Sequence, residues 1–311
     1  MDADIVIFGG HAHAALADEI CADLGVPRSP VHTTRFANDC LQVQLQANCR
    51  ERDVYLIQPL VPPVQENLVE LLLMADAARG ASAARVTAVM SHYAYARSDK
   101  KDAPRISIGG RLVADLLVTA GVNRVLTLNL HSPQVHGFFS VPVDHLHALR
   151  ELASHFRQRD LSNAVVVSPD LGYAKSAAAF ARRLGLPVAA GAKERISDAE
   201  VHITAIIGDV AGRDVIVLDD EISRGTTVFE LLDRLRDEGA RSVAVACTHG
   251  LFADNALDKL AGTADVTEIV CTNSAPIHAE HPKLTVLSVG PALAEAISRI
   301  HNGESVSALF D

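Results

Sequence analysis

The sequence predicts an α/β protein with two similar domains, each a mostly parallel β-sheet flanked by helices. Short runs of branched aliphatic residues, such as residues 215–218, alternate along the chain with longer segments whose apolar residues recur at helical spacing. Strands that alternate with helices form parallel sheets with helices on both faces. The chain has 311 residues, enough for two separate cores, and both halves show the same alternation. Asp and Pro breaks at 141–149 place the boundary near residue 145.

The first domain, residues 1–145, begins with a strand at 4–8, a Gly9-Gly10 turn and a helix at 14–24. Residues 41–46 alternate polar and apolar side chains, which is typical of a half-buried strand. The remaining strands are predicted from apolar runs and the remaining helices from a single apolar face. These strands are expected at 53–58, 86–90 and 124–130, and these helices at 67–78 and 108–120.

The second domain, residues 146–311, repeats this arrangement, which suggests a duplication. Its helices are expected at 146–157, 174–184, 228–239 and 293–300. Its strands are expected at 164–167, 215–218, 242–248, 268–271 and 284–289, with a weaker candidate at 201–206. The last helix and the tail could pack back on the first domain.

Composition narrows the class of protein. A net charge of −10 argues against a general nucleic-acid binder. No apolar run reaches the roughly 20 residues that a membrane span needs, and the first residues lack the basic segment of a signal peptide. The five cysteines are scattered without CxxC spacing, which predicts reduced thiols. We therefore expect a cytoplasmic protein whose partners include neither nucleic acid nor membrane.

The most informative stretch is the polar loop that follows the strand at 215–218. Asp219 and Asp220 come directly after the strand, and a Ser-Arg-Gly-Thr-Thr loop at 223–227 leads into a helix. A strand end, a hydroxyl-rich loop and a helix start together form a cup that suits a phosphate, because the helix dipole is positive there. The two carboxylates suit sugar hydroxyls or a hydrated metal ion instead. The alternative is an ordinary connection in which Asp and Thr cap the helix.

Other polar segments also follow predicted strands. His131 and Asp170 each come just after a strand, where ligands bind in open α/β sheets, and together they would suit Mg²⁺ alongside substrate phosphates. The segment 95–105 is rich in charge, and 192–197 is expected to be a mobile loop whose cations could close over a polyphosphate. For both charged segments, an ordinary solvated loop is the alternative.

The 223–227 loop resembles the phosphoribosyl-pyrophosphate loop of type I phosphoribosyltransferases. The whole chain resembles the ribose-phosphate pyrophosphokinase family, because its segments follow that family's order and spacing. These segments are RFAND (35–39), YARSDKKD (95–102), LHSPQVHGFF (130–139), VPVD (141–144), SPDLG (168–172), KER (193–195), GDVAGRD (208–214), LDDEISRGTT (218–227), CTHGLF (247–252) and NGESVSALF (302–310). The resemblance implies two type I phosphoribosyltransferase-like domains. It also implies transfer of the β,γ-diphosphoryl group of ATP to the anomeric hydroxyl of ribose 5-phosphate, releasing AMP.

The resemblance assigns roles residue by residue. Nucleotide binding is implied for Phe36, Asn38, Cys40, Arg97, Ser98 and Asp99, and Mg²⁺ binding for His131 and Asp170. Lys193 and Arg195 match the pair that stabilises the transferring group. Binding of ribose 5-phosphate is implied for Asp219, Asp220, Ser223, Arg224, Gly225, Thr226 and Thr227.

Several positions depart from the family's usual pattern. Cys40 stands where an acidic residue is usual, Ser98 where Gln is usual, and Asn129 where Asp commonly precedes the metal-binding His. Glu194 replaces a basic residue, and Arg224 and Thr226 replace the more usual Thr and Gly.

The resemblance leaves three alternatives to an active diphosphokinase. They are a non-catalytic subunit that regulates a true synthetase, a phosphoribosyltransferase, and a paralogue with another nucleotide or sugar phosphate. The complete first domain argues against the phosphoribosyltransferase. Retention of both loop cations and both adjacent carboxylates argues against the non-catalytic subunit. The family forms homo-oligomers, often hexamers built from dimers, so we expect a dimer-based oligomer.

Overall fold

A computed structural model describes residues 4–195 and 201–309 of the chain. It divides into two compact units. The first comprises Met1–His147, Ser274–Pro276 and Val289–Asp311, and the second comprises Ala148–Asn273 and Ile277–Ser288. The last helix therefore belongs to the first unit. Within the described ranges, no helix is both long enough and apolar enough to cross a bilayer.

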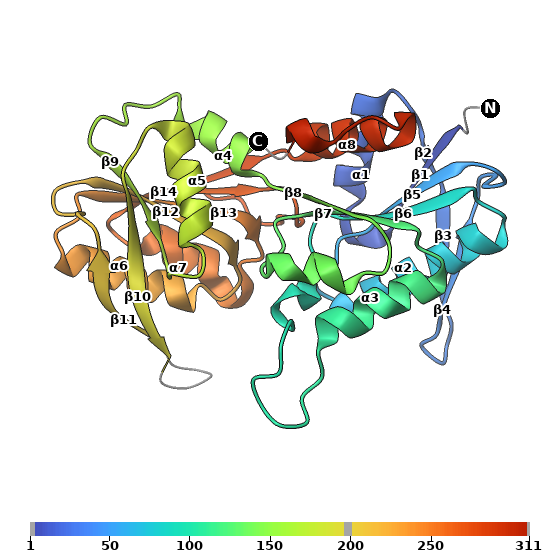
Figure 1. Ribbon diagram of the computed structural model, residues 1–311, viewed down its shortest axis with the longest axis horizontal. Coiled ribbons are helices and arrows are strands. Elements are labelled where there is room, and N and C mark those ends of the chain that lie inside the picture. The colour runs from blue at the N-terminus through green and yellow to red at the C-terminus, as the bar shows by residue number, and fades with distance from the viewer. Residues whose placement is uncertain (1–3, 196–200, 310–311) are drawn as a thin grey trace. The chain divides into compact units, whose positions relative to one another are not determined.

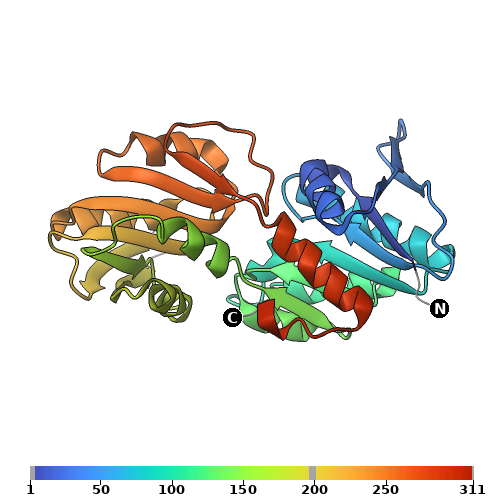
Figure 2. The same cartoon turned by 90° about the horizontal axis from the view of Figure 1, so that it is seen from above.

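The first unit is built on a six-stranded sheet in the order β2-β1-β5-β6-β7-β8, in which every pairing is parallel. The strands are β1 (Ile5–Gly9), β2 (Arg28–Ser29), β5 (Asp53–Ile57), β6 (Arg85–Met90), β7 (Arg124–Leu128) and β8 (Val143–Leu146). Helices α2 (Val64–Gly80) and α3 (Gly109–Ala120) cover one face. Helices α1 (Ala14–Leu24) and α8 (Gly290–Asn302) pack against each other on the opposite face (Figure 1, Figure 2).

A separate two-stranded hairpin projects from the first unit. It consists of β3 (Val31–Arg35) and β4 (Leu41–Leu45), which pair antiparallel. Two side chains of α2 hold it: the Thr33 hydroxyl donates to Glu70 Oε1 at 2.8 Å, and Arg35 forms an ion pair with Glu66 at 2.5 Å. Glu70 is buried at 2% exposure, so β3 is anchored to α2 at Thr33 and Arg35, while residues 36–40 of the tip are exposed.

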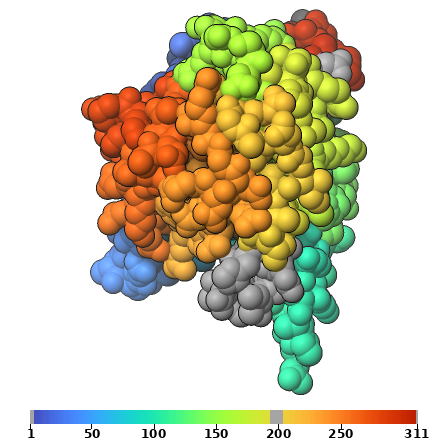
Figure 3. All heavy atoms as spheres, turned by 90° about the vertical axis from the view of Figure 1, so that its left-hand side faces the viewer, coloured from blue at the N-terminus to red at the C-terminus, as the bar shows by residue number. Residues whose placement is uncertain are grey.

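The second unit is built on a seven-stranded sheet in the order β11-β10-β9-β12-β13-β14-β15, in which only the β10–β11 pairing is antiparallel. The strands are β9 (Ala164–Ser168), β10 (Val188–Arg195), β11 (Val201–Ile207), β12 (Asp214–Ile222), β13 (Ser242–Gly250), β14 (Val266–Thr272) and β15 (Leu284–Leu287). Helices α4 (Leu149–Phe156) and α5 (Ala174–Leu184) pack on one face, and α6 (Thr226–Asp237) and α7 (Ala256–Gly262) pack on the other. In the space-filling view, the yellow surface of β10 and β11 and the orange-red surface around β15 lie at opposite edges of this unit (Figure 3).

Both units connect their strands in the same way. The order β2-β1-β5-β6-β7-β8 corresponds strand for strand to β10-β9-β12-β13-β14-β15, with β11 added at one edge. The predicted fold class, two similar α/β domains with mostly parallel sheets flanked by helices, is confirmed. The shared connectivity is also what a duplication would produce.

Some predicted elements need correction. Strand β12 continues past Leu218 through the two carboxylates to Ile222, because its parallel pairing with β13 continues as far as Ile222 opposite Gly250. The expectation of a loop at 192–197 is wrong for residues 192–195, which end strand β10, and residues 196–197 lie outside the described ranges. The strand predicted at 41–46 lies in the hairpin and not in the main sheet. Strands β2, β3, β8 and β10 and helix α7 were not predicted.

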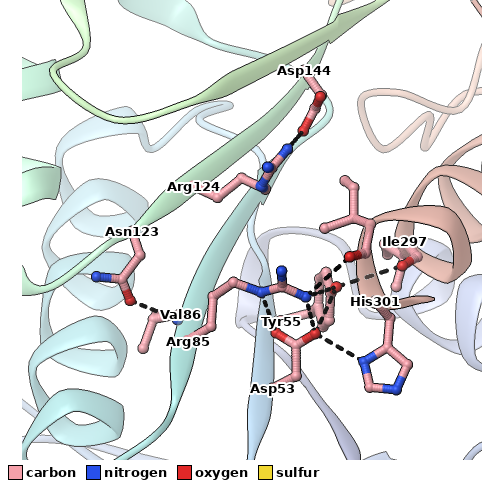
Figure 4. Close-up of polar contacts among 10 residues, drawn as sticks. Asp53, Tyr55, Arg85, Val86, Asn123, Arg124, Asp144, Ile297 and His301 are labelled. Carbon is pink, nitrogen blue, oxygen red and sulfur yellow. Dashed lines mark hydrogen bonds and ion pairs between the residues drawn. The ribbon is translucent and has the colours of Figure 1, made fainter. Parts of the chain in front are cut away.

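Helix α8 is joined to the first sheet by a buried polar network centred on Asp53 (Figure 4). The Asp53 carboxylate accepts hydrogen bonds from Arg85 Nε at 2.8 Å, from the Tyr55 hydroxyl at 3.0 Å, and from His301 Nδ1 at 2.8 Å. Arg85 also donates to the Ile300 carbonyl at 3.2 Å, near the end of α8, where a helix leaves carbonyls without intrahelical partners. Burial alone would raise the pKa of Asp53, but the hydrogen bonds from Arg85 and His301 outweigh burial and hold it below its usual value.

Candidate functional site

Three carboxylates meet at the carboxyl edge of the second sheet. Strands β9 and β12 are parallel neighbours, and Val167 lies opposite Val217. The register therefore brings Asp170, just beyond the end of β9, close to Asp219 and Asp220 on the last part of β12. This edge is where open α/β sheets bind their ligands.

The acidic pair is arranged so that its charges interact strongly. Asp220 is 4% exposed, and its backbone N–H donates to Asp219 Oδ1 at 2.9 Å. Burial, followed by the charge of Asp220, raises the pKa of Asp219 well above its usual value, and Asp170 adds to the effect. A ligand that donates hydrogen bonds or carries positive charge would relieve this repulsion.

Asp170 is held by its own loop. The Ser168 hydroxyl donates to the Asp170 carbonyl at 2.6 Å, and the Tyr173 backbone N–H donates to Asp170 Oδ1 at 3.0 Å. Gly172 lies close by, and a Cβ there would come within 3.1 Å of Asp170 Oδ1. The carboxylate is therefore oriented by the turn that leads into α5.

The 223–227 loop joins β12 to α6 and forms the predicted cup. Gly225 is the N-cap of α6 and has φ +75°, which favours glycine, and no side chain caps this helix. The alternative in which Asp and Thr cap the helix is therefore wrong. Helix α6 begins at Thr226, two residues earlier than predicted. Thr226 and Thr227 therefore lie in its first turn, and their hydroxyls are at the same end of the helix as the amides that lack intrahelical partners.

The equivalent loop of the first unit lacks this chemistry. It joins β5 to α2 through Gln58-Pro-Leu-Val-Pro-Pro, with no glycine and no hydroxyl. Gln58 and Leu60 are fully buried there. Both units thus have an equivalent strand-to-helix loop, but only the loop of the second unit has the glycine and hydroxyl residues that suit a phosphate.

Arg224 makes an ion pair that the sequence did not reveal. Its Nε lies 2.7 Å from Oδ2 of Asp254, a residue of the segment between β13 and α7. Asp254 was not among the predicted site residues. The pairing connects residues 30 positions apart through two loops that follow neighbouring strands.

The backbone of Lys193 and Arg195 lies in strand β10, where Lys193 pairs with Ile203 and Arg195 with Val201 of β11. Strand β10 neighbours β9, whose end leads to Asp170. The side chains of residues 193–195 lie outside the described part of the structure.

In the first unit, the candidate adenine-binding residues occupy the hairpin tip. Phe36 is 48% exposed, and Asn38 and Cys40 are also exposed. The turn is closed by a hydrogen bond from the Phe36 N–H to the Cys40 carbonyl at 2.9 Å, and Asn38 Oδ1 accepts from the Cys40 N–H at 3.3 Å. The hairpin thus presents an aromatic face to solvent.

The remaining candidates of the first unit follow the neighbouring strands β6 and β7. Arg97 ends a short 3-10 helix, and Ser98 accepts a hydrogen bond from the Gly109 N–H at 2.8 Å, which ties it to the start of α3. Asp99 accepts from Gln134 Nε2 at 2.7 Å, and this contact joins the 97–99 segment to the loop that carries His131. The structure therefore brings these segments together, whereas the hairpin tip is a separate feature.

The described ranges contain no group of three or more His, Cys, Asp or Glu side chains arranged to hold a metal ion. His131 belongs to the first unit and Asp170 to the second. Mg²⁺ commonly binds through one or two carboxylates, several waters and substrate phosphates. The sheet edge with Asp170, Asp219 and Asp220 therefore suits Mg²⁺ bound together with substrate, and does not form a metal centre made of protein ligands alone.

Comparison with known proteins identifies the family. Residues 5–121 match the family model described as the N-terminal domain of ribose phosphate pyrophosphokinase, and residues 192–311 match the phosphoribosyl synthetase-associated domain. The chain belongs to the ribose-phosphate pyrophosphokinase family. The predicted resemblance is confirmed over both halves of the chain.

Relatives of the family match nearly the whole chain. A Streptomyces coelicolor relative is 72% identical over 310 residues, covering 99% of this chain and 98% of its own. The Deinococcus radiodurans ribose-phosphate pyrophosphokinase is 49% identical, covering 98% of each chain. The crystal structure of the Mycobacterium smegmatis phosphoribosylpyrophosphate synthetase is similar with a TM-score of 0.90 and 37% identity, over 96% of this chain and 99% of that one.

Proposed function

We propose that the protein is a ribose-phosphate diphosphokinase, which transfers the diphosphoryl group of ATP to the anomeric hydroxyl of ribose 5-phosphate. The products are phosphoribosyl pyrophosphate and AMP. The observation that carries the proposal is the combination, at one sheet edge, of an acidic pair with a hydroxyl-rich loop at a helix start, in a chain of this family. In this proposal the first unit binds the nucleotide and the second unit binds the sugar phosphate.

Each part of the second unit has a role suited to its chemistry. Asp219 and Asp220 accept hydrogen bonds from the ribose hydroxyls, which compensates for the burial, and relieves the repulsion from Asp220, that together raise the pKa of Asp219. The 223–227 loop binds the 5-phosphate with its hydroxyls and with the first amides of α6. Diphosphoryl transfer needs positioning and charge stabilisation more than covalent help, and Lys193 and Arg195 supply the positive charge.

The residues of the first unit are proposed to bind ATP. Phe36 would stack on the adenine, with Asn38 and Cys40 beside it. Arg97, Ser98 and Asp99 would lie along the nucleotide and its phosphates. Because the hairpin tip is separate from the 97–99 segment, the hairpin would complete the nucleotide site of a neighbouring subunit in the oligomer. The exposed ring of Phe36 and the Asp99–Gln134 contact support these assignments. Ser98 also closes the loop at the start of α3, so its role is in part structural.

Mg²⁺ dependence is part of the proposal. Mg²⁺ neutralises triphosphate charge when it is bound, and Asp170 and His131 are the candidate ligands by resemblance. The support from the structure is electrostatic. Three neighbouring carboxylates, among which Asp170 and Asp220 raise the pKa of Asp219, favour a cation at this edge.

A direct assay tests the function. Purified protein is incubated with ATP, Mg²⁺ and ribose 5-phosphate, and AMP and phosphoribosyl pyrophosphate are quantified together by chromatography. Equal amounts of both products are expected. Failure to form AMP with any nucleoside triphosphate would instead support a regulatory subunit. AMP formation only with another sugar phosphate, or use of a different triphosphate, would support a paralogue with altered preference, which Cys40, Ser98 and Arg224 make worth testing.

We propose a homo-oligomer built from dimers, up to a hexamer, on the basis of the family. Light scattering coupled to size-exclusion chromatography tests this, and a monomer at assay concentrations would contradict it. The cytoplasmic location stays a prediction.

A further inference from the structure

The inference concerns the ion pair between Arg224 and Asp254. Arg224 lies in the 223–227 loop, and its side chain is 76% exposed, while that of Asp254 is 62% exposed. Arg224 Nε and Asp254 Oδ2 are 2.7 Å apart. An ion pair this exposed contributes little to stability, because water and salt screen it. Its position beside a phosphate-binding loop is therefore of more interest than its energy.

Asp254 is held in an unusual backbone conformation. Phe252, Asp254 and Asn255 all have left-handed φ, at 44°, 54° and 60°, although none is glycine. Non-glycine residues adopt this region at a cost, and such strain clusters at functional sites. The segment between β13 and α7 is thus built to place the Asp254 carboxylate where it lies.

The surroundings of this segment explain how the strain is maintained. The Leu251 and Phe252 amides both donate to the Ile222 carbonyl at 3.0 Å, and Ile222 directly precedes the 223–227 loop. The Phe252 ring lies over Gly250, where a Cβ would come within 2.5 Å of it. On the other side, Ala256 and Leu257 are buried in the core. Asp254 and the loop that carries Arg224 are therefore fixed on one common support.

Arg224 has two potential acceptors at this place. A guanidinium can bind either a carboxylate or a phosphate, because the same fork of N–H donors matches both. The structure shows it engaged by the carboxylate. A phosphate that enters the 223–227 loop must either draw Arg224 away from Asp254 or bind beside a positive charge that Asp254 already offsets.

We infer that Asp254 is a positioning residue that holds Arg224 at the rim of the loop and competes with the sugar phosphate for it. This rests on the proposed function, because it takes the 223–227 loop as the 5-phosphate site. Asp254 thereby weakens binding of the phosphorylated sugar, and Arg224 determines how strongly the loop binds a phosphate.

The test measures ribose 5-phosphate binding to the full chain by calorimetry, with inorganic phosphate as a second probe. Asp254→Asn removes the charge, and Asn tolerates left-handed φ. It is expected to lower the Kd for ribose 5-phosphate by roughly 3- to 10-fold at low salt, with a smaller gain at high salt. Arg224→Gln is expected to raise the Kd by about 10-fold or more, because it removes a charged hydrogen-bond donor.

The double variant isolates the coupling. With Arg224→Gln already present, Asp254→Asn is expected to change the Kd less than about 2-fold, because the competition it relieves is gone. In turnover, Asp254→Asn is expected to lower the KM for ribose 5-phosphate and leave the KM for ATP unchanged. Asp254→Gly, which also relieves the strained φ, is expected to tighten binding in the same way. Asp258→Asn, which removes one charge from the exposed surface of α7, is the matched control and is expected to change nothing.

The outcomes separate this inference from the proposed function. If wild-type protein binds no ribose 5-phosphate, the proposed site is wrong and the inference is overturned with it. If wild-type protein binds it but Asp254→Asn weakens or does not alter binding, the proposed site stands and the competition is refuted. An equal gain from Asp258→Asn would also refute it, since the effect would then be general charge and not Asp254.

Discussion

Replacing Asp53 by Ala should destabilise the first unit far more than an ordinary surface substitution. Asp53 is 3% exposed and accepts hydrogen bonds from Arg85, Tyr55 and His301, so its removal leaves buried donors without an acceptor (Figure 4). Losing one partner of a buried ion pair costs about 3–5 kcal/mol. Since the Arg85 side chain is 33% exposed and can be partly rehydrated, we expect the lower end, about 3 kcal/mol.

The loss can be measured by calorimetry and by hydrogen exchange. For a unit of this size, about 3 kcal/mol corresponds to a fall in Tm of roughly 6–12 °C. The amides of α8 should exchange faster, because Arg85 and His301 no longer join the helix to the sheet through Asp53, while those of β12 in the second unit keep their protection. Asp53→Asn keeps the shape and loses the charge, so it should give an intermediate fall.

A matched control lies on the same helix. Glu295 and Arg299 form an i,i+4 ion pair on the surface of α8, and Glu295→Gln should change stability by about 0.5 kcal/mol or less.

The effect of Asp53→Asn should also depend on pH. The folded pKa of Asp53 lies below its unfolded value, so its stabilisation is complete above that unfolded value and is lost as pH falls through the folded pKa. A Tm for Asp53→Ala within 1 °C of wild type, with unchanged exchange of α8, would refute this reasoning.

Three further predictions concern the proposed active site. Lys193→Ala and Arg195→Ala should each lower kcat by roughly 100-fold or more with little change in KM, because these cations act mainly in the transition state. Lys259→Ala is the control, and unchanged turnover of the Lys193 and Arg195 variants would contradict the proposed roles. Phe36→Ala should raise the KM for ATP by roughly 5- to 100-fold through lost stacking, whereas Leu112→Ala, at a similarly exposed position on α3, should not. Asp219→Asn should lower turnover and yet raise the Tm of the ligand-free protein. Because burial and the neighbouring carboxylates raise the folded pKa of Asp219 above its unfolded value, this carboxyl destabilises the folded protein at pH values above the unfolded pKa. A scanning-fluorimetry Tm below wild type would argue against this.

The sequence predicted the elements that have a strong local pattern. The aliphatic runs of β9, β12 and β13 and the apolar face of α5 identified the second sheet and one helix that covers it. Strand β3 was missed because VHTTR is largely polar, and its pairing with β4 depends on a partner that lies beyond a turn. The end of β12 was misplaced because acidic residues mimic a loop, while the parallel pairing that keeps them in the strand comes from β13.

The candidate site shows the same limit. Asp219, Asp220 and the 223–227 loop are adjacent in sequence, so their pattern was readable, and β12 and α6 place them together. The Arg224–Asp254 contact was not predictable, because it joins two loops that are 30 positions apart in the sequence and depends on the left-handed backbone conformation of Asp254. Gln134, which donates to Asp99, was likewise hidden because a glutamine in a loop carries no signal of its own.

The path of the chain through the two units limits how the protein can be dissected. The chain leaves the first unit after His147, returns briefly at Ser274–Pro276, and returns for good at Val289. A fragment that stops at residue 147 would omit α8, so it would expose the surface that covers Ala296 and Ile297 and deprive Asp53 of His301. Neither unit is one continuous segment of the chain. To express the first unit in isolation, residues 289–311 would have to be joined to residues 1–147 by a linker or added as a second polypeptide.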